Sequence, residues 1–133
     1  MRLQGKIAVV TGAGSGFGAG IARKFAAEGA RVLVADINPD AARAVASGIG
    51  GTAFCADVAS GDSVAALASA AEQMGPVDIL GNNAGITHLP ALLEEVIEAD
   101  FDRVFAVNCK SVYLTARAFV PAMKARGRGA ILN

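Results

Sequence analysis

Several side-chain types are scarce in this chain of 133 residues. It has no tryptophan, one tyrosine (Tyr113) and one histidine (His88). So few rings argue against a protein that binds single-stranded nucleic acid by stacking bases on aromatic side chains. A lone histidine and two distant cysteines, Cys55 and Cys109, do not match the ligand spacing of a zinc site. We therefore predict no metal site, and we interpret both cysteines as small core hydrophobes in a reducing compartment, the cytoplasm.

The chain also lacks an excess of charge of either sign. The chain has 12 Lys and Arg against 12 Asp and Glu, and charged residues make up only 18%. A net charge of zero argues against non-specific binding to nucleic acid. No apolar run approaches the roughly 18 residues of a membrane span, and the apolar stretch near Met1 is too short for a signal peptide. We expect a small-molecule partner, with no nucleic acid and no membrane.

What the chain does have is an alternation of short apolar runs and longer helical patterns. The expected strands cover residues 6–11, 31–36, 51–56, 77–80 and 130–133, and the expected helices cover 16–28, 39–49, 60–74, 92–97 and 100–124. Because the strands are apolar on both faces, the pattern predicts a parallel sheet with helices on each side. Right-handed crossovers then give an α/β, doubly wound, Rossmann-like sheet in the order 3-2-1-4-5, truncated at the fifth strand.

A glycine-rich loop, Thr11-Gly-Ala-Gly-Ser-Gly-Phe-Gly18, lies between the first expected strand and the first helix. Gly12 permits a tight exit from the strand, and Gly16 and Gly18 permit close approach to the helix start. Free N–H groups and the positive helix end favour an anion there. A bare strand-to-helix turn would need only one glycine. The spacing fits T-G-x(3)-G-x-G, because G-x-G-x-x-G read from Gly12 would need glycine where Phe17 stands.

Asp36 ends the second strand, 18 residues after Gly18. A carboxylate in this position can accept both ribose hydroxyls of an adenosine, and it would repel a 2′-phosphate. Ser15 and Ile37 are the residues best placed to meet that phosphate, and neither is basic. The sequence therefore favours NAD over NADP. A carboxylate that caps the following turn is a simpler interpretation, and it is compatible with the first.

Three further motifs make the pattern specific. Asp57-Val58 follows strand three, Asn82-Asn-Ala-Gly85 follows strand four, and Asn108 lies inside the long helix. Together with the glycine loop and Asp36, they make the whole chain resemble the classical short-chain dehydrogenase/reductases, and in particular the branch of 3-oxoacyl-carrier-protein reductases and glucose dehydrogenase-like members. The resemblance implies an NAD-dependent oxidoreductase that transfers a hydride between nicotinamide and a carbonyl or secondary alcohol.

The resemblance also implies a role for each matching residue. In the family pattern the pyrophosphate lies along the loop of Gly12, Ser15, Gly16, Phe17 and Gly18, and Asp36 holds the adenosine ribose. Ile37 and Val58 flank the adenine, and Asp57 binds its amino group. Asn82, Ala84 and Gly85 run beside the nicotinamide ribose, Asn83 steadies the central sheet, and Asn108 holds a water of the catalytic proton relay. From its chemistry alone, a satisfied buried amide is the less favoured alternative for Asn108.

The family's catalytic serine and its Tyr-x-x-x-Lys motif follow the fifth strand, and this chain does not contain them. Its only tyrosine, Tyr113, is followed four residues later by Arg117 rather than lysine. We expect residues 1–133 to be the N-terminal, dinucleotide-binding portion of a longer single-domain enzyme, inactive alone and assembled into a homo-oligomer through helix 100–124. The alternatives are a truncated nucleotide-binding module without catalysis, and a methyltransferase of similar fold.

Overall fold

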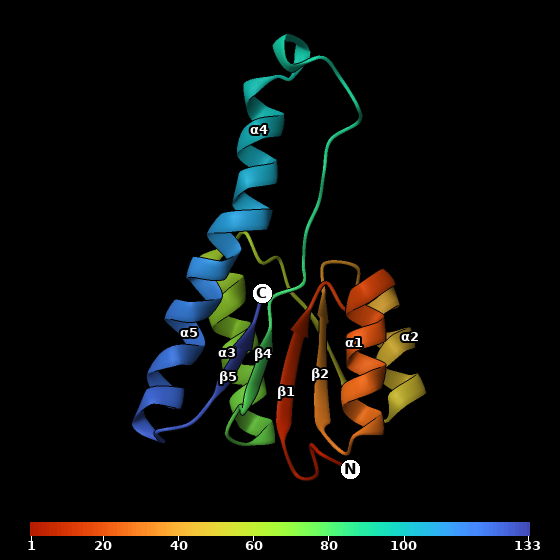
Figure 1. Ribbon diagram of the computed structural model, residues 1–133, viewed down its shortest axis with the longest axis vertical. Helices are drawn as coiled ribbons and strands as arrows, with labels where there is room; N and C mark the ends of the chain where they lie inside the picture. Colours follow the sequence, from red (N-terminus) through yellow and green to blue (C-terminus); the bar gives the residue numbers. More distant parts are fainter.

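A parallel sheet lies between two layers of helices in the computed structural model, which describes residues 1–133 (Figure 1). The strands are β1 (Ile7–Thr11), β2 (Arg31–Asp36), β3 (Thr52–Cys55), β4 (Ile79–Gly81) and β5 (Ala130–Leu132). They pair in parallel in the order β3-β2-β1-β4-β5, which confirms the predicted doubly wound topology. The fourth strand differs from the expected range 77–80, because its pairing with β1 begins only at Ile79.

Four helices cover the sheet, and two of them begin at a capping side chain. The four are α1 (Gly16–Ala27), α2 (Pro39–Ile49), α3 (Gly61–Met74) and α5 (Ser111–Ala125), and the capped two are α2 and α3. The Asn38 side chain accepts hydrogen bonds from the first N–H groups of α2, and the Ser60 hydroxyl accepts one from the first turn of α3. Each cap satisfies N–H donors that have no partner inside the helix.

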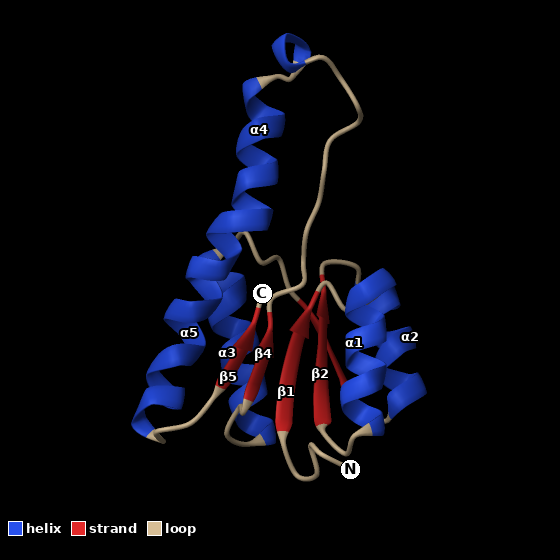
Figure 2. Ribbon diagram, viewed as in Figure 1, coloured by secondary structure: helices blue, strands red, loops and turns tan.

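The core has two halves, one on each face of the sheet. Helices α1 and α2 cover one face, and α3 and α5 cover the other (Figure 2). Alternate residues of β1 divide between the faces: Val9 packs with Leu67 of α3 and Phe119 of α5, whereas Val10 packs with Ala22 of α1. A fully buried central strand with both faces covered explains the continuous apolar run of β1.

The expected single helix over 100–124 is divided into three segments. It begins as α4 (Glu98–Phe105), passes through a π-helical turn, η2 (Ala106–Lys110), and continues as α5. The expected short helix at 92–97 is only a 3₁₀ turn, η1 (Leu93–Glu95). Helix α4 projects beyond the carboxyl ends of the strands, and none of its residues is buried (Figure 1).

Both cysteines were expected in the core, and this prediction is wrong: Cys55 and Cys109 are exposed. Cys55 ends β3, which pairs with only one neighbour and lies at the edge of the sheet. Cys109 lies in η2, which contains no buried residue. No helix is long and apolar enough to cross a membrane.

Candidate functional site

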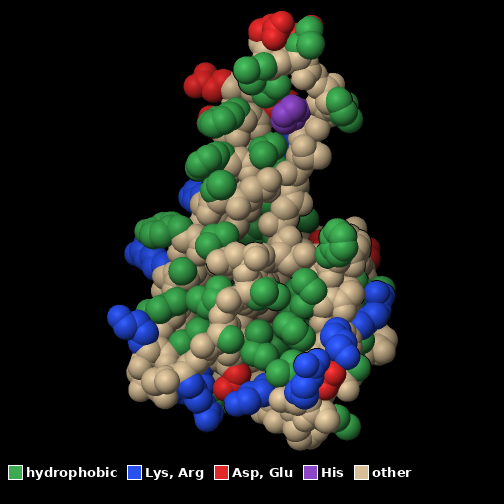
Figure 3. All heavy atoms as spheres, in the orientation of Figure 1, with side chains coloured by type: hydrophobic (Ala, Val, Ile, Leu, Met, Phe, Trp, Pro, Cys, Tyr) green, Lys and Arg blue, Asp and Glu red, His purple; other side chains and the backbone are tan.

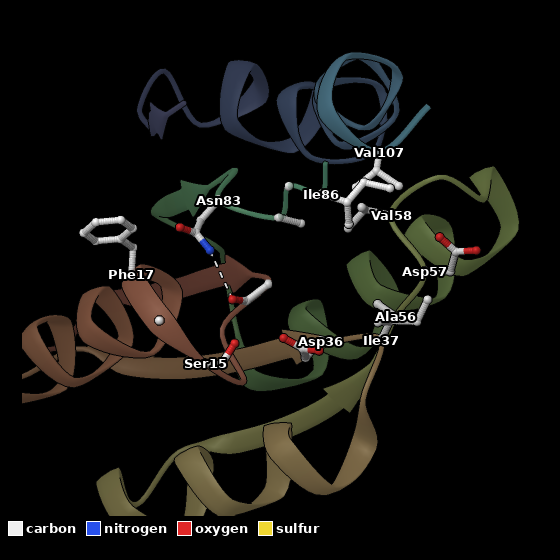
Figure 4. Close-up of a pocket in the computed structure, with 14 residues that line it drawn as sticks. Ser15, Phe17, Asp36, Ile37, Ala56, Asp57, Val58, Asn83, Ile86 and Val107 are labelled. Carbon is white, nitrogen blue, oxygen red and sulfur yellow. Dashed lines mark hydrogen bonds between the residues drawn. The ribbon is translucent and has the colours of Figure 1, made fainter. Parts of the chain in front are cut away.

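A cavity of about 400 Å³ opens at the carboxyl ends of β1, β2 and β4 (Figure 4). In a parallel α/β sheet, this edge at the point where the strand order reverses is where ligands bind. The lining comes from five segments that are far apart in the sequence: Gly12, Ser15, Gly16 and Phe17; Asp36 and Ile37; Ala56, Asp57 and Val58; Asn83, Ala84, Gly85 and Ile86; and Val107 of η2.

The turn from β1 into α1 depends on glycine at two positions. Gly12 has φ +61°, and a Cβ there would lie 2.7 Å from the Ala84 Cα. A Cβ on Gly18 would lie 2.2 Å from the Gly12 carbonyl oxygen. Both contacts are shorter than real Cβ atoms show, so any side chain would push apart the turn, α1 and the segment after β4.

The start of α1 has N–H groups that could hold an anion. Ser15 precedes the helix in an extended conformation, and its hydroxyl makes no capping hydrogen bond. The first turn contains no acidic residue that could occupy the free N–H groups. Since Ser15 and Gly16 line the cavity, these donors and the positive helix end face the space where a phosphate could lie.

Thr11 and Asn83 join the ends of β1 and β4. The buried Thr11 Oγ1 accepts hydrogen bonds from the backbone N–H groups of Asn83 and Ala84, both at 3.1 Å. The Asn83 amide nitrogen in turn donates to the carbonyls of Thr11 at 3.0 Å and Gly12 at 3.1 Å. The glycine turn and the segment after β4 therefore form one rigid wall of the cavity.

Asp36 stands at the end of β2 with its carboxylate held by two backbone donors. Its Oδ2 accepts from the Gly14 N–H at 2.8 Å, and its Oδ1 accepts from the Asn38 N–H at 2.9 Å. The carboxylate thus steadies the glycine loop and the start of α2, as the capping interpretation expected. It also lines the cavity, where its remaining lone pairs can accept further hydroxyl donors.

The segment after β3 forms the wall beside Asp36. Val58 is buried, and Ile37 exposes its side chain into the opening. The Asp57 Oδ1 accepts from the Ala59 N–H at 2.9 Å, and the Asp57 N–H donates to the Ser63 hydroxyl at 2.9 Å. These local bonds fix the turn into α3, so two apolar side chains and one carboxylate surround this end of the cavity.

The structure brings most of the predicted site residues together. Ten of them line the cavity: Gly12, Ser15, Gly16, Phe17, Asp36, Ile37, Asp57, Val58, Ala84 and Gly85. The other three, Gly18, Asn82 and Asn108, are not in the lining. Gly18 lies behind it, where the lack of a side chain lets α1 approach Gly12.

Asn82 and Asn108 both contact the framework around the cavity. The Asn82 side chain donates to Asn133 Oδ1 and accepts from the Thr115 hydroxyl, each at 2.8 Å. It therefore connects β4 to the end of β5 and to α5. Asn108 lies in the π-helical turn, and its side-chain amide binds the backbone of Ile86. The amide is therefore satisfied, but Asn108 is exposed, so the expectation of a buried amide is wrong: η2 contains no buried residue.

Sequence reasoning missed three lining residues, Ala56, Ile86 and Val107, and it did not place Asn83 in the lining. Ala56 and Ile86 adjoin predicted motifs, so their positions next to Asp57 and Gly85 were a usable signal. Val107 gave none, because its place depends on how η2 turns over the sheet. No group of three or more metal-ligand side chains is present.

Comparison with known proteins agrees with this geometry. The family described as short chain dehydrogenase matches residues 6–133. The chain is 43% identical over 138 residues to the D-threitol dehydrogenase of Mycolicibacterium smegmatis, with 99% of this chain and 53% of that protein covered. It is 44% identical over 135 residues to the galactitol 2-dehydrogenase (L-tagatose-forming) of Cereibacter sphaeroides, with the same two shares.

Two solved structures show the same fold. A 3-ketoacyl-(acyl-carrier-protein) reductase from Brucella melitensis, complexed with NADH, superposes with a TM-score of 0.95 at 45% identity, with 98% of this chain and 57% of that chain covered. A metagenomic short-chain oxidoreductase in complex with NADP gives 0.91 at 42%, with 98% and 62% covered. The chain spans about half the length of the curated relatives that it matches. By the family match over nearly all its residues and by its sheet and glycine turn, the chain belongs to the short-chain dehydrogenase family.

Proposed function

We propose that this chain holds the nucleotide of an NAD-dependent oxidoreductase, which moves a hydride between nicotinamide and a carbonyl or secondary alcohol. The observation that carries the proposal is a single cavity that joins the start of α1 to the Asp36 carboxylate. A dinucleotide needs an anion site for its pyrophosphate and an acceptor for its ribose hydroxyls, and both are present at this edge of the sheet. The family match leaves the methyltransferase alternative without support.

The residues present fit such a cofactor. The close approach at Gly12 and Gly18 leaves room for a pyrophosphate over the α1 start, beside Ser15 and Gly16. Asp36 would accept the adenosine ribose hydroxyls. Ile37 and Val58 would flank the adenine, and Asp57 would accept from its amino group. Ala84 and Gly85 would lie along the second ribose. When bound, the nicotinamide supplies the hydride chemistry, and the protein binds and orients it.

The same residues support NAD over NADP. None of the lining residues is a lysine, an arginine or a histidine, so nothing in the cavity would balance the charge of a 2′-phosphate. The Asp36 carboxylate would repel that phosphate. Solved relatives hold NADH in one case and NADP in another, so this preference depends on Asp36 and its surroundings.

The substrate class follows from what the relatives share. D-threitol and galactitol dehydrogenases act, by their names, on polyols, and the reductase from Brucella melitensis acts on a ketoacyl group. A secondary alcohol and its ketone are common to these reactions. We therefore propose a small polyol or ketone as the substrate, with no nucleic acid and no membrane as partner.

We assign Asn108 a positioning role in catalysis, because both atoms of its amide hold Ile86 at the edge of the cavity. The single tyrosine, Tyr113, lies on α5 and outside the cavity lining. We therefore expect the chain by itself to bind nucleotide without turnover. The alternative is a binding module without any catalytic role. Dehydrogenase activity of the whole protein would exclude that alternative.

The apolar surface of α4 supports a homo-oligomer. Phe101 and Phe105 are 60% and 55% exposed, and their rings stack with centroids 5.8 Å apart. Leu93 and Ile97 extend the same projecting part of the molecule, where Figure 3 shows hydrophobic side chains along its length. Exposed apolar patches of this kind mark protein–protein contacts. We propose that a second copy of the chain covers α4.

Calorimetric titration of the chain with NAD⁺, NADP⁺ and S-adenosylmethionine tests the proposed function. We expect saturable binding of NAD⁺ at one site per chain, weaker binding of NADP⁺, and no heat from S-adenosylmethionine. Binding of S-adenosylmethionine alone, or of no nucleotide, would overturn the proposal.

A further inference from the structure

Phe17 is an exposed aromatic side chain within the cavity lining. The residue is 89% exposed, although it lines the cavity. No other residue of the cavity lining is aromatic. The other strongly exposed aromatic residues, Phe101, Phe105 and Tyr113, lie on α4 and α5 and away from the cavity. A single exposed apolar side chain is common on protein surfaces, so exposure alone identifies no ligand. Phe17 differs because it also lines the cavity, where a bound ligand group can cover its ring.

The position of Phe17 identifies which part of the ligand lies there. In Figure 4, Phe17 stands on the side of Asn83, and Asp57 and Ile37 stand on the opposite side. If the adenosine lies against Asp36 and Ile37, the pyrophosphate crosses the start of α1, and the second nucleoside extends toward Ala84 and the Phe17 ring. This step rests on the proposed function.

The two redox states of a nicotinamide differ in charge. The oxidised ring is a pyridinium cation, and the reduced ring is neutral. The face of a phenylalanine ring is negative and attracts a cation placed over it. The only charged side chains in the lining, Asp36 and Asp57, lie on the adenosine side in this arrangement. Phe17 is therefore the side chain at the nicotinamide end that can distinguish the two states by electrostatics.

We infer that the Phe17 ring packs on the nicotinamide and selects the oxidised cofactor over the reduced one by a cation–π contact. A branched aliphatic residue in this position would provide apolar contact for both states alike. The aromatic ring adds attraction for the cation alone, so this chain should bind NAD⁺ more tightly relative to NADH than a Phe17→Leu variant does.

The test is calorimetric titration of the full chain and two variants with NAD⁺ and with NADH. Phe17→Leu keeps the apolar bulk and removes the aromatic ring, whereas Phe17→Tyr keeps the ring. A cation–π contact at an exposed site corresponds to about a two- to fivefold change in binding. We expect the ratio of the two dissociation constants, NAD⁺ over NADH, to rise by about that factor in Phe17→Leu and to stay unchanged in Phe17→Tyr.

Other outcomes are distinguishable. If Phe17→Leu weakens the binding of NAD⁺ and of NADH equally, Phe17 contributes only apolar packing. That result would overturn the inference and leave the proposed function standing. A Phe17→Tyr variant that behaves as Phe17→Leu would overturn it as well. Failure of the unmodified chain to bind either form would overturn the proposed function together with the inference. Because the side chain is exposed, both variants should keep the parent's urea midpoint, which is the check on folding.

Discussion

Asn108 binds the backbone of Ile86 through both atoms of its side-chain amide. The Ile86 N–H donates to Asn108 Oδ1 at 2.8 Å, and Asn108 Nδ2 donates to the Ile86 carbonyl at 2.9 Å. The pair connects the π-helical turn to the segment after β4 and so links α4 and α5 to the cavity wall. π-helical turns of this kind often occur at functional sites.

Replacing Asn108 should loosen this connection. Asn108→Leu removes both hydrogen bonds, and we expect a loss of about 1–2 kcal/mol in the free energy of unfolding. NAD⁺ binding should weaken severalfold, because Ile86 and Gly85 line the cavity. Urea unfolding and calorimetric titration measure the two effects. Lys110→Ala, an exposed change in the same turn, is the control. Unchanged binding in Asn108→Leu would show that the cavity wall does not depend on this pair.

Removing the charge of Asp36 should change the nucleotide preference. Asp36→Asn retains one acceptor oxygen for Gly14 or Asn38 but loses the carboxylate. Hydrogen bonds to a charged group contribute about 1.5–3 kcal/mol, so we expect NAD⁺ to bind at least about tenfold more weakly and NADP⁺ to be affected less. Asp40→Asn, an exposed change next to this site, should leave both affinities unaltered. Tighter binding of NADP⁺ than of NAD⁺ by the unmodified chain would contradict the role given to Asp36.

Glu28 makes stability depend on pH in the acid range. The Arg2 N–H donates to its carboxylate at 3.0 Å, and the side chains of Lys24 and Arg2 lie 2.9 and 3.3 Å away. These contacts lower the pKa of Glu28 from its usual 4.5 to about 2. Because the folded-state pKa is depressed, the stabilisation is complete above pH 4.5 and disappears as the pH falls toward 2.

We expect Glu28→Gln to unfold at a lower urea concentration than the parent at pH 7, and the difference to shrink as the pH approaches 2. Urea midpoints measured at both ends of this range check the expectation. Glu72→Gln, on α3, serves as a control, since it has no ion pair among those found. A constant difference between Glu28→Gln and the parent across the range would rule out the charge of Glu28 as the cause.

The Asp78 carboxylate lies close to three basic side chains at the amino end of the sheet. Its Oδ1 lies 3.7 Å from Lys6, 3.6 Å from Arg126 and 3.7 Å from Arg128, and its Oδ2 accepts from the Ile7 N–H at 3.1 Å. The Arg126 Nε and Nη1 atoms are buried without a hydrogen-bond partner, so this carboxylate is what compensates their charge. Figure 3 shows that basic and acidic side chains lie next to one another at the lower end of the molecule.

Asp78→Asn should therefore cost about 2 kcal/mol of stability, because Arg126 is left without compensation and the Ile7 contact is weakened. Arg128→Ala should cost less than about 1 kcal/mol, since that side chain is 64% exposed. Urea unfolding of both variants gives the comparison. Equal losses would mean that solvent, rather than Asp78, compensates the Arg126 guanidinium.

The α4 surface predicts a change in assembly. Phe101→Glu places a charge in the middle of the stacked pair with Phe105, and we expect it to convert a dimer or larger assembly into a monomer. Glu98→Gln on the same helix should leave the assembly intact. Sedimentation velocity across a range of concentrations measures the state. If the parent is a monomer at every concentration, the proposal that a second copy of the chain covers α4 is wrong.

Local sequence signals were sufficient wherever short-range chemistry fixes the structure. Asn38-Pro39 and Ser60 marked the starts of α2 and α3, because caps act on the next few N–H groups. Apolar runs marked the strands, since a parallel sheet covered on both sides needs them. The same logic placed the glycine turn and Asp36 at strand ends, and hence at one edge of the sheet.

The structure decided what depends on contacts between distant segments. Sequence alone could not show that Asn83, one residue from Asn82, reaches Thr11 and Gly12, while Asn82 turns to Asn133 and Thr115. Successive side chains of an extended segment point to opposite sides, and only the neighbouring strands determine which side holds the cavity.

The sequence by itself thus determined the doubly wound sheet, the family and most of the residues around the cavity, because these depend on periodicity and on chemistry at strand ends. Only the tertiary structure decided the exposure of Cys55, the π-helical turn at Asn108 and the exposed position of Phe17. Each depends on which elements happen to cover a residue, and coverage is a property of packing between segments far apart in the chain.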